Sequence, residues 1–199
     1  MKVIGLTGGI GSGKTTVMKM FQELDIPVYI ADVEAKKLMQ TLGILKYELI
    51  ANFGELAFKN GVLNTSYLAE IVFSDAEKLK KINQIVHPKV RAHFQQFKAL
   101  QNSNYIIFEN AILFENGFDN LCDYIITITA PLEDRIKRVQ QRDGLNRAQI
   151  LSRVNNQWSD EQKIKKSHFI IENSNLKETQ KKVLEIHEKL LKFIEINNI

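Results

Sequence analysis

The chain has 199 residues, 44% of them hydrophobic and 25% charged, which is enough for one folded unit with a sizeable core. Its net charge of +4 is modest and comes without a basic stripe interleaved with aromatic residues, so we expect no nucleic-acid partner. No apolar stretch approaches the ~18 residues that a membrane span needs. The single Cys122 excludes an internal disulfide, and we expect a reducing, cytoplasmic location.

The first predicted element is a strand over residues 2–7, and a glycine-rich loop follows it at once. The loop Gly8-Gly9-Ile10-Gly11-Ser12-Gly13-Lys14-Thr15 fits the pattern of a glycine, four residues, and then Gly-Lys-Ser/Thr. Val17, Phe21 and Leu24 share one helix face, which predicts a helix after the loop. In this setting main-chain N–H groups and the positive end of the helix bind the phosphates of a nucleotide.

This loop supplies most of the residues that we predict to bind the nucleotide. We expect Lys14 to reach the β- and γ-phosphates of ATP and to act in catalysis, and the Thr15 hydroxyl to hold Mg²⁺. The predicted nucleotide-binding residues of the loop are Gly11, Ser12, Gly13, Lys14, Thr15 and Thr16.

A second strand is predicted over residues 26–30 and ends in Ala31-Asp32. Ligands of open α/β sheets sit beyond the carboxyl ends of the strands, so Asp32 is a candidate to take a proton from an attacking hydroxyl. An N-cap for a helix that begins at Val33 explains the same aspartate equally well, and the two roles are compatible.

The next 70 or so residues are predicted to be mostly helical. Helices are expected over residues 36–53 with a break at Gly43, over residues 66–73, and over residues 75–100 with an interruption at His87-Pro88. Such a block exceeds the dozen or so residues of a plain crossover. It therefore predicts an inserted subdomain that surrounds an acceptor substrate, with a purely structural insertion as the alternative.

Three more strands are predicted over residues 105–109, 123–129 and 168–171. Glu109 ends the first of them and is a candidate for a contact to Mg²⁺ through water, although the strict nucleotide motif has Asp at that place. Asn173 follows the last strand, where its amide suits an adenine ring and a turn-forming role explains it nearly as well. A final amphipathic helix is expected after it.

An arginine-rich segment lies between the last two strands. Pro131 is predicted to open a helix that carries Arg135, Arg138 and Arg142 on one face. A turn at Asp143-Gly144 then leads to a second helix. Two short helices rich in arginine predict a lid that closes over transferring phosphates. The alternative is a solvated basic face with acidic partners of its own.

These observations combine with several further motifs. The motifs are Leu6-Thr7-Gly8-Gly9-Ile10-Gly11-Ser12-Gly13-Lys14, Ala31-Asp32, Phe53-Gly54, His87-Pro88, Leu113-Phe114-Glu115, Arg138-x-x-x-Arg142-Asp143, Arg153-x-x-x-Gln157 and Ile171-x-Asn173. In them the chain resembles the dephospho-CoA kinase family over nearly its whole length. The resemblance implies an α/β, three-layer P-loop kinase fold with a five-stranded parallel sheet. Its core would comprise residues 1–31, 103–135 and 154–199, its helical substrate-binding insertion residues 32–102, and its lid residues 136–153.

The resemblance also implies a reaction, in which the γ-phosphoryl group of ATP moves to the ribose 3′-hydroxyl of dephospho-CoA. Asp32 matches the family's general base, His87 a residue of the substrate side, and Asn173 a residue beside the adenine. Arg138 matches a catalytic lid residue and Arg142 a lid residue near the nucleotide phosphates. The implied partners are ATP and dephospho-CoA, with no membrane partner, and the implied state is a monomer or weak homo-oligomer. The departures from the family pattern are Ile30, Thr65, Ala111 and His168.

Two other functions compete with this one. A P-loop kinase for another small hydroxyl acceptor, such as a nucleoside or shikimate, would share the loop. A GTPase-type switch would carry Asp-x-x-Gly and Asn-Lys-x-Asp after the loop, and neither occurs in the chain.

Overall fold

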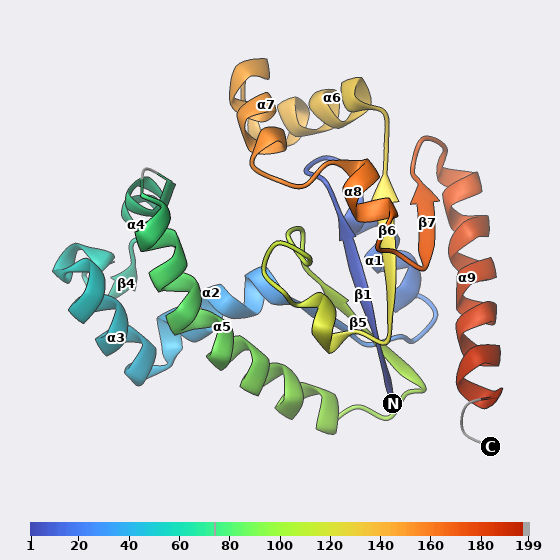
Figure 1. Cartoon of the computed structure of the whole chain (residues 1–199), viewed down its shortest axis with the longest axis horizontal. Helices are drawn as coiled ribbons and strands as arrows, with labels where there is room; N and C mark the ends of the chain where they lie inside the picture. Colours follow the sequence, from blue (N-terminus) through green and yellow to red (C-terminus); the bar gives the residue numbers. More distant parts are fainter. Residues whose placement is uncertain (74, 197–199) are drawn as a thin grey trace. The chain divides into compact units, whose positions relative to one another are not determined.

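The computed structural model describes residues 1–73 and 75–196 (Figure 1). The chain divides into two compact units. The sheet unit contains Met1–Tyr29 and the chain from Asn102 onward, and the helical unit contains Ile30–Gln101. Within the described residues, no helix combines the length and the apolar character that crossing a bilayer requires.

A five-stranded sheet with the order β2-β5-β1-β6-β7 forms the centre of the sheet unit. Its strands are β1 (Lys2–Gly8), β2 (Val28–Ile30), β5 (Tyr105–Glu109), β6 (Tyr124–Thr129) and β7 (Phe169–Glu172). The central β1 pairs in parallel with β5, where Leu6 lies opposite Glu109, and with β6, where Leu6 lies opposite Ile126. β1 and β5 are buried almost throughout, as expected for strands covered on both faces. The predicted five-stranded parallel sheet is confirmed.

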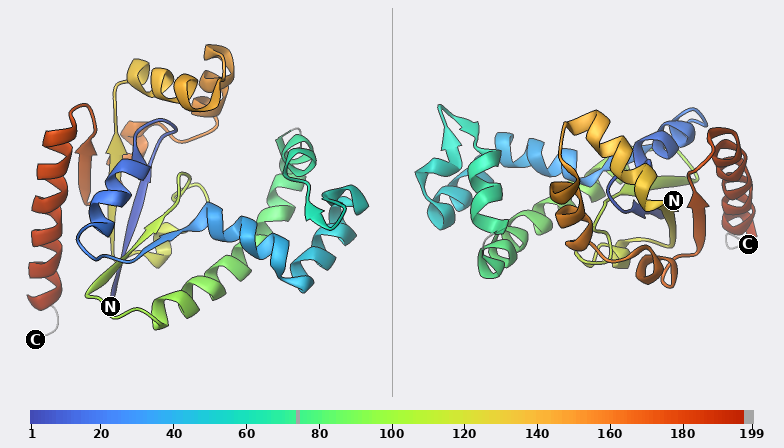
Figure 2. Two further views of the ribbon diagram at one scale, coloured as in Figure 1. Left: turned by 180° about the vertical axis from the view of Figure 1, so that it is seen from behind. Right: turned by 90° about the horizontal axis from the view of Figure 1, so that it is seen from above.

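Helices surround this sheet. They are α1 (Lys14–Gln22), η2 (Asp119–Leu121), α6 (Leu132–Asp143), α7 (Arg147–Asn155), α8 (Asp160–Ile164) and α9 (Leu176–Ile196). Helices α1 and α9 contact each other beside the strands (Figure 2). The predicted amphipathic last helix is confirmed, with Val183, Leu190 and Ile194 buried, whereas Leu176 and Leu184, which we predicted on the same buried stripe, are exposed. Pro131 is the N-cap of α6 and not its first helical residue, so that prediction was wrong by one position.

The helical unit has its own small core. Its elements are α2 (Ala31–Thr41), α3 (Gly43–Phe53), η1 (Glu55–Ala57), the hairpin strands β3 (Phe58–Lys59) and β4 (Val62–Leu63), α4 (Thr65–Phe73) and α5 (Ala76–Ala99). Leu49, Phe53, Ala57 and Leu68 form the buried cluster between them. The predicted break at Gly43 is confirmed, because α2 ends at Thr41 and α3 begins at Gly43.

Two local predictions for this unit were wrong. Helix α5 continues through Pro88 without the predicted interruption, since Val86, Val90 and Phe94 bury one face on both sides of the proline. Burial of that face offsets the lost hydrogen bond. Helix α2 begins at Ala31, so Asp32 is its second residue and not its N-cap. The Asp32 carboxylate still lies in the first turn, where the helix dipole favours negative charge.

Candidate active site

The loop between β1 and α1 has the conformation that its glycines permit. Gly11 and Gly13 have φ angles of +78° and +96°, in the left-handed region that a side chain disfavours. The Ser12 N–H donates to the Gly9 carbonyl at 3.1 Å and closes a turn. The Thr16 N–H donates to the Gly13 carbonyl at 3.0 Å and starts α1. The loop is thus a tight bend that delivers the chain into the first turn of a helix.

Unused donors gather in this bend. The N–H groups of Gly11 and Gly13 have no hydrogen-bond partner among residues 1–73 and 75–196. The buried hydroxyl of Ser12 likewise has no partner in the described part of the chain. Lys14 donates from Nζ to the Gly8 carbonyl at 2.9 Å, which folds its ammonium group back over the loop. Unsatisfied main-chain donors, a cation and a helix N-terminus in one place suit a phosphate group.

Arg138 and Asn173 hold the second half of the loop. Arg138 donates from Nη2 to the Asn173 carbonyl at 2.7 Å and from Nη1 to the Ser12 carbonyl at 3.3 Å. The buried Asn173 amide donates to the same Ser12 carbonyl at 2.9 Å and accepts from the Thr179 hydroxyl at 3.1 Å. The structure therefore uses the Asn173 side chain to fasten the loop to the start of α9. No sequence signal pointed to Thr179.

The three arginines of α6 differ in their surroundings. Arg135 is 6% exposed, pairs with Asp160 at 3.1 Å and donates to the Ile10 carbonyl, so it belongs to the framework around the loop. Arg135 thus has the acidic partner of the alternative interpretation, but it is buried and not part of a solvated face. Arg142 has 62% of its side chain exposed and pairs with the adjacent Asp143, whose pKa it lowers by a hydrogen bond.

Helices α6 and α7 form one small body. Ile136 and Val139 of α6 pack against Ile150 of α7 in a buried cluster. Asn146 caps α7 in a capping box with Gln149. The segment that the sequence predicts to be a lid is therefore held together by its own core.

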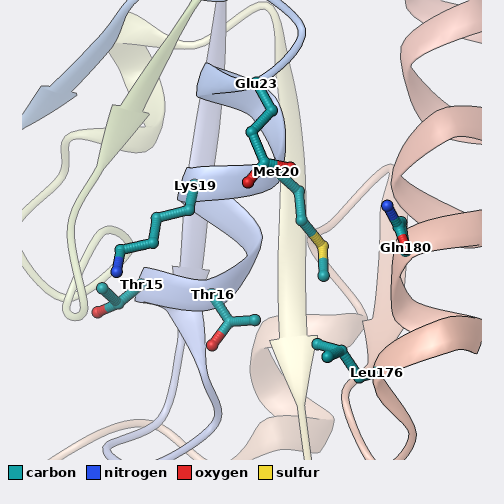
Figure 3. A pocket seen from close by; sticks show the side chains of 7 residues that line it. All are labelled: Thr15, Thr16, Lys19, Met20, Glu23, Leu176 and Gln180. Atoms are coloured by element: carbon teal, nitrogen blue, oxygen red, sulfur yellow. The ribbon is translucent and has the colours of Figure 1, made fainter.

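A hollow of about 420 Å³ continues from the loop along α1 (Figure 3). Thr15, Thr16, Lys19, Met20 and Glu23 line it from α1, and Leu176 and Gln180 line it from α9. In Figure 3 the side chains of Thr16, Met20 and Leu176 face the space between the two helices. The hollow thus starts at the two threonines that end the glycine-rich motif.

Comparisons with known proteins agree on one family. The family model described as "Dephospho-CoA kinase" matches residues 2–178. A dephospho-CoA kinase of Bacteroides fragilis is 39% identical over 184 residues, covering 92% of this chain and 90% of its relative. The chain belongs to the dephospho-CoA kinase family. The resemblance inferred from the motifs is confirmed, and with it the expectation of a kinase.

Solved structures extend the agreement to the fold. The crystal structure of TT1252 from Thermus thermophilus matches with a TM-score of 0.88 and 33% identity, covering 94% of this chain and 96% of that one. A dephospho-CoA kinase from Campylobacter jejuni matches with a TM-score of 0.69 and 28% identity, covering 96% and 97%. A shikimate kinase from Bacteroides thetaiotaomicron has 16% identity and a TM-score of 0.50, covering 95% and 98%, which is a likeness of fold alone.

In this dephospho-CoA kinase family member, Glu109 lies at the carboxyl end of β5 beside β1. It is 5% exposed and stands opposite Leu6, two residues before the loop begins at Gly8. The exposed Thr15 hydroxyl lies in the first turn of α1. Both residues offer oxygen, the ligand type that Mg²⁺ takes. The ligand type of each residue therefore fits the metal that we expect.

The family motif Leu113-Phe114-Glu115 forms an anchoring loop after β5. The fully buried Lys163 donates to the Ala111 carbonyl at 2.7 Å and lies 3.3 Å from Glu115 Oε1. Burial lowers the pKa of Lys163, and the charge of Glu115 opposes that shift. Glu115 Oε1 also accepts from the Trp158 main-chain N–H at 2.8 Å. These contacts give the motif a structural role that spacing alone did not reveal.

The remaining predicted residues, Asp32 and His87, belong to the helical unit. Asp32 is exposed in the first turn of α2. His87 is half-buried on α5, and burial lowers its pKa to about 4, with a smaller effect from the charge of Arg91. His87 is therefore neutral near pH 7 and presents one donor and one acceptor nitrogen.

Proposed function

We propose that the chain transfers the γ-phosphoryl group of ATP to the ribose 3′-hydroxyl of dephospho-CoA, giving CoA and ADP in the last step of CoA synthesis. The observation that carries this proposal is the set of unpaired amides of Gly11 and Gly13 beside Lys14, in a chain of this family. Such a cradle favours a polyphosphate over a neutral ligand, because each phosphate oxygen supplies the acceptor that a buried N–H lacks.

We assign the nucleotide to the loop and to the hollow beside it. The phosphates take the amides of Gly11 and Gly13, and the nucleoside follows Thr16 towards the space between α1 and α9. The volume of about 420 Å³ is within the range of small-molecule sites. Since the Asn173 amide is already bonded to Ser12 and Thr179, its role beside the nucleotide is to hold the loop.

We assign the chemistry to four charged side chains. The Asp32 carboxylate accepts the proton of the ribose hydroxyl as its oxygen attacks the γ-phosphorus, and the bond from that phosphorus to the β,γ-bridging oxygen breaks. Lys14 and Arg138, with Arg142 of the lid, offset the negative charge on the phosphate oxygens. Neutral His87 serves the dephospho-CoA side as a hydrogen-bonding group.

Thr15 and Glu109 are the residues that we assign to Mg²⁺, Thr15 through its hydroxyl and Glu109 through water. The ion, when bound, neutralises charge on the β- and γ-phosphate oxygens. Thr15→Val should raise the Mg²⁺ concentration for half-maximal rate about tenfold, since it removes one oxygen ligand and keeps the shape. Thr15→Ser retains the hydroxyl and should behave as the wild type. Equal Mg²⁺ dependence in both variants contradicts the assignment.

The decisive experiment measures ADP release with a panel of acceptors. Dephospho-CoA should support turnover, whereas CoA, whose 3′-position already carries phosphate, should not. Phosphorus NMR should show a new 3′-phosphomonoester. Shikimate or a nucleoside as the better acceptor would overturn the proposal in favour of the rival kinases. The proposed location is the cytoplasm, and the proposed state is a monomer or weak homo-oligomer, which sedimentation measures directly.

A further inference from the structure

The two peptide groups that flank Ile10, at the outer turn of the phosphate loop, are each held by a side chain from outside the loop. The Ile10 N–H donates to Gln157 Oε1 at 2.9 Å. The Ile10 carbonyl accepts from Arg135 Nε at 2.9 Å. Both contacts lie within the sheet unit, and both use side chains more than 100 residues away in sequence.

These two side chains stand at the two ends of the predicted lid. Arg135 immediately precedes residues 136–153, and Gln157 follows them by four positions. In Figure 1 the α6–α7 segment leaves the end of β6 and returns to α8 near the loop after β1. Both ends of the lid are therefore fastened to the same residue, Ile10.

The side chains of Arg135 and Gln157 are themselves held in place by neighbouring residues. Arg135 is 6% exposed, and its Nη1 pairs with Asp160. A Cβ at Gly11 would lie 2.5 Å from the Arg135 carbonyl, so the loop and α6 pack without space between them. Gln157 precedes Trp158, whose ring stacks on Phe114 at 5.7 Å.

The orientation of these two peptide groups, Gly9–Ile10 and Ile10–Gly11, matters for the loop that follows. Because the Ile10 N–H points to Gln157, that N–H is unavailable to a ligand. The next amides, at Gly11 and Gly13, are the ones without a partner in the described chain. Because the peptide groups around Ile10 are fixed, the free N–H groups of the loop are already oriented before a ligand binds. This lowers the entropy cost of binding phosphate.

We propose that Gln157 and Arg135 are positioning residues for nucleotide binding, which fix the phosphate loop through the two peptide groups that flank Ile10 and transmit its occupation to the lid. The inference rests on the proposed function for its biological meaning, but its test requires only a polyphosphate ligand. Gln157 is the better residue to change, because Arg135 is buried in an ion pair and its loss endangers folding.

Only the acceptor oxygen of Gln157 takes part in the contact. Gln157→Met keeps the length and loses the acceptor, whereas Gln157→Glu keeps both. The matched control is Gln96→Met, on an exposed position of α5. We expect Gln157→Met to weaken ATP and inorganic tripolyphosphate about tenfold, the effect of one hydrogen bond. Gln157→Glu should restore most of the affinity in 0.3 M salt, where its added charge is largely screened.

Calorimetry gives the affinities, and Trp158, the single tryptophan of the chain, reports on the end of the lid segment. Tripolyphosphate should change the Trp158 fluorescence of the wild type and of Gln157→Glu, with a smaller change in Gln157→Met. KM for ATP should rise in Gln157→Met while KM for the acceptor stays constant. A purely structural role would instead lower the melting temperature and impair both Gln157 variants alike.

Two results would overturn the inference. One is wild-type affinity for tripolyphosphate in Gln157→Met, and the other is a Trp158 signal that ignores tripolyphosphate in the wild type. Failure of the proposed function looks different, because the wild type would then bind tripolyphosphate normally and leave dephospho-CoA unphosphorylated.

Discussion

The sheet unit and the helical unit carry their candidate residues in different ways. In the sheet unit, the loop carbonyl of Ser12 receives hydrogen bonds from both Arg138 and Asn173, and the neighbouring Ile10 is held on both sides. In the helical unit, Asp32 is an exposed side chain in a first helical turn, and His87 is half-buried in a long helix. One unit offers a binding surface of main-chain groups, and the other offers single side chains.

This difference indicates which unit contributes to each step of the proposed reaction. A main-chain N–H cannot be altered by changing a side chain at its own position. The arrangement of these donors therefore depends on the side chains that hold the loop. A carboxylate or imidazole on a helix can be removed without disturbing its backbone. We therefore expect substitutions of Asp32 in the helical unit to change turnover without changing nucleotide binding, and substitutions of the side chains that hold the loop in the sheet unit to change nucleotide binding.

The largest effect is expected for Asp32→Asn. If Asp32 is the general base, kcat should fall by roughly 10²–10⁴, because the amide cannot accept the ribose proton. The Kd for ATP should stay at the wild-type value. Steady-state ADP release with dephospho-CoA measures the first quantity, and calorimetry measures the second.

The control for this change lies two residues further along the same helix. Glu34→Gln also removes one carboxylate from α2, and Glu34 pairs with Lys37 at 2.7 Å on the surface. Its kcat should match that of the wild type. Near-normal turnover in Asp32→Asn, with intact folding, would remove Asp32 from the chemistry and leave only its place in the first turn of α2.

The next largest effect is expected for Lys14→Met in the sheet unit. Lys14 Nζ lies 2.9 Å from the Gly8 carbonyl, over the loop. Loss of this cation should lower kcat/KM for ATP by about 10²–10³, the usual cost of removing one preorganised charged donor. Binding of dephospho-CoA alone should not change. Lys182→Met, on the exposed face of α9, is the matched control, and normal ATP kinetics in Lys14→Met would argue against the phosphate cradle.

Local sequence patterns were enough to predict the frame of the sheet unit. Loop, strand and first helix follow from neighbours within about eight positions, where glycine conformation and helical spacing act directly. The same local reasoning failed at Pro88, because packing of Val86, Val90 and Phe94 along α5 outweighs the proline's preference. It also failed by one position at Pro131.

The contacts that hold the loop could not be predicted in this way. Gln157 meets Ile10 across 147 positions, and Asn173 meets Ser12 across 161, so no periodicity links them. The motifs placed Arg135 and Arg142 on one helix face, yet one is buried and the other exposed. That distinction depends on Asp160 and on the packing of α6 against the loop, which only the folded chain defines.

A smaller effect on turnover and stability should distinguish Arg138 from Arg142, which both belong to the sheet unit. Arg142→Ala should lower kcat about tenfold, if its exposed guanidinium reaches the phosphates in turnover, and should leave the melting temperature unchanged. Arg138→Ala should also lower the free energy of unfolding by about 1–2 kcal/mol, because it leaves the Asn173 and Ser12 carbonyls without this donor. Equal losses of stability in the two variants would contradict the distinction between an arginine that holds the loop and an exposed one.

The smallest predicted effect concerns His87 and acid stability in the helical unit. Burial lowers the pKa of folded His87 from 6.5 to about 4, so between these values the unfolded chain binds the proton more readily. Stability should therefore fall as pH drops from about 6.5 towards 4. The effect of the shift on stability is reduced by partial exposure to solvent, and we expect about 1 kcal/mol, or 2–4 °C in melting temperature.

His87→Gln should show a smaller drop in melting temperature between pH 7.5 and pH 5 than the wild type. His187 adds a similar background, since burial also lowers its pKa, and it is common to both proteins. An identical drop in the two would mean that His87 has the same pKa in the folded and the unfolded chain, which would contradict the lowering of its pKa by burial.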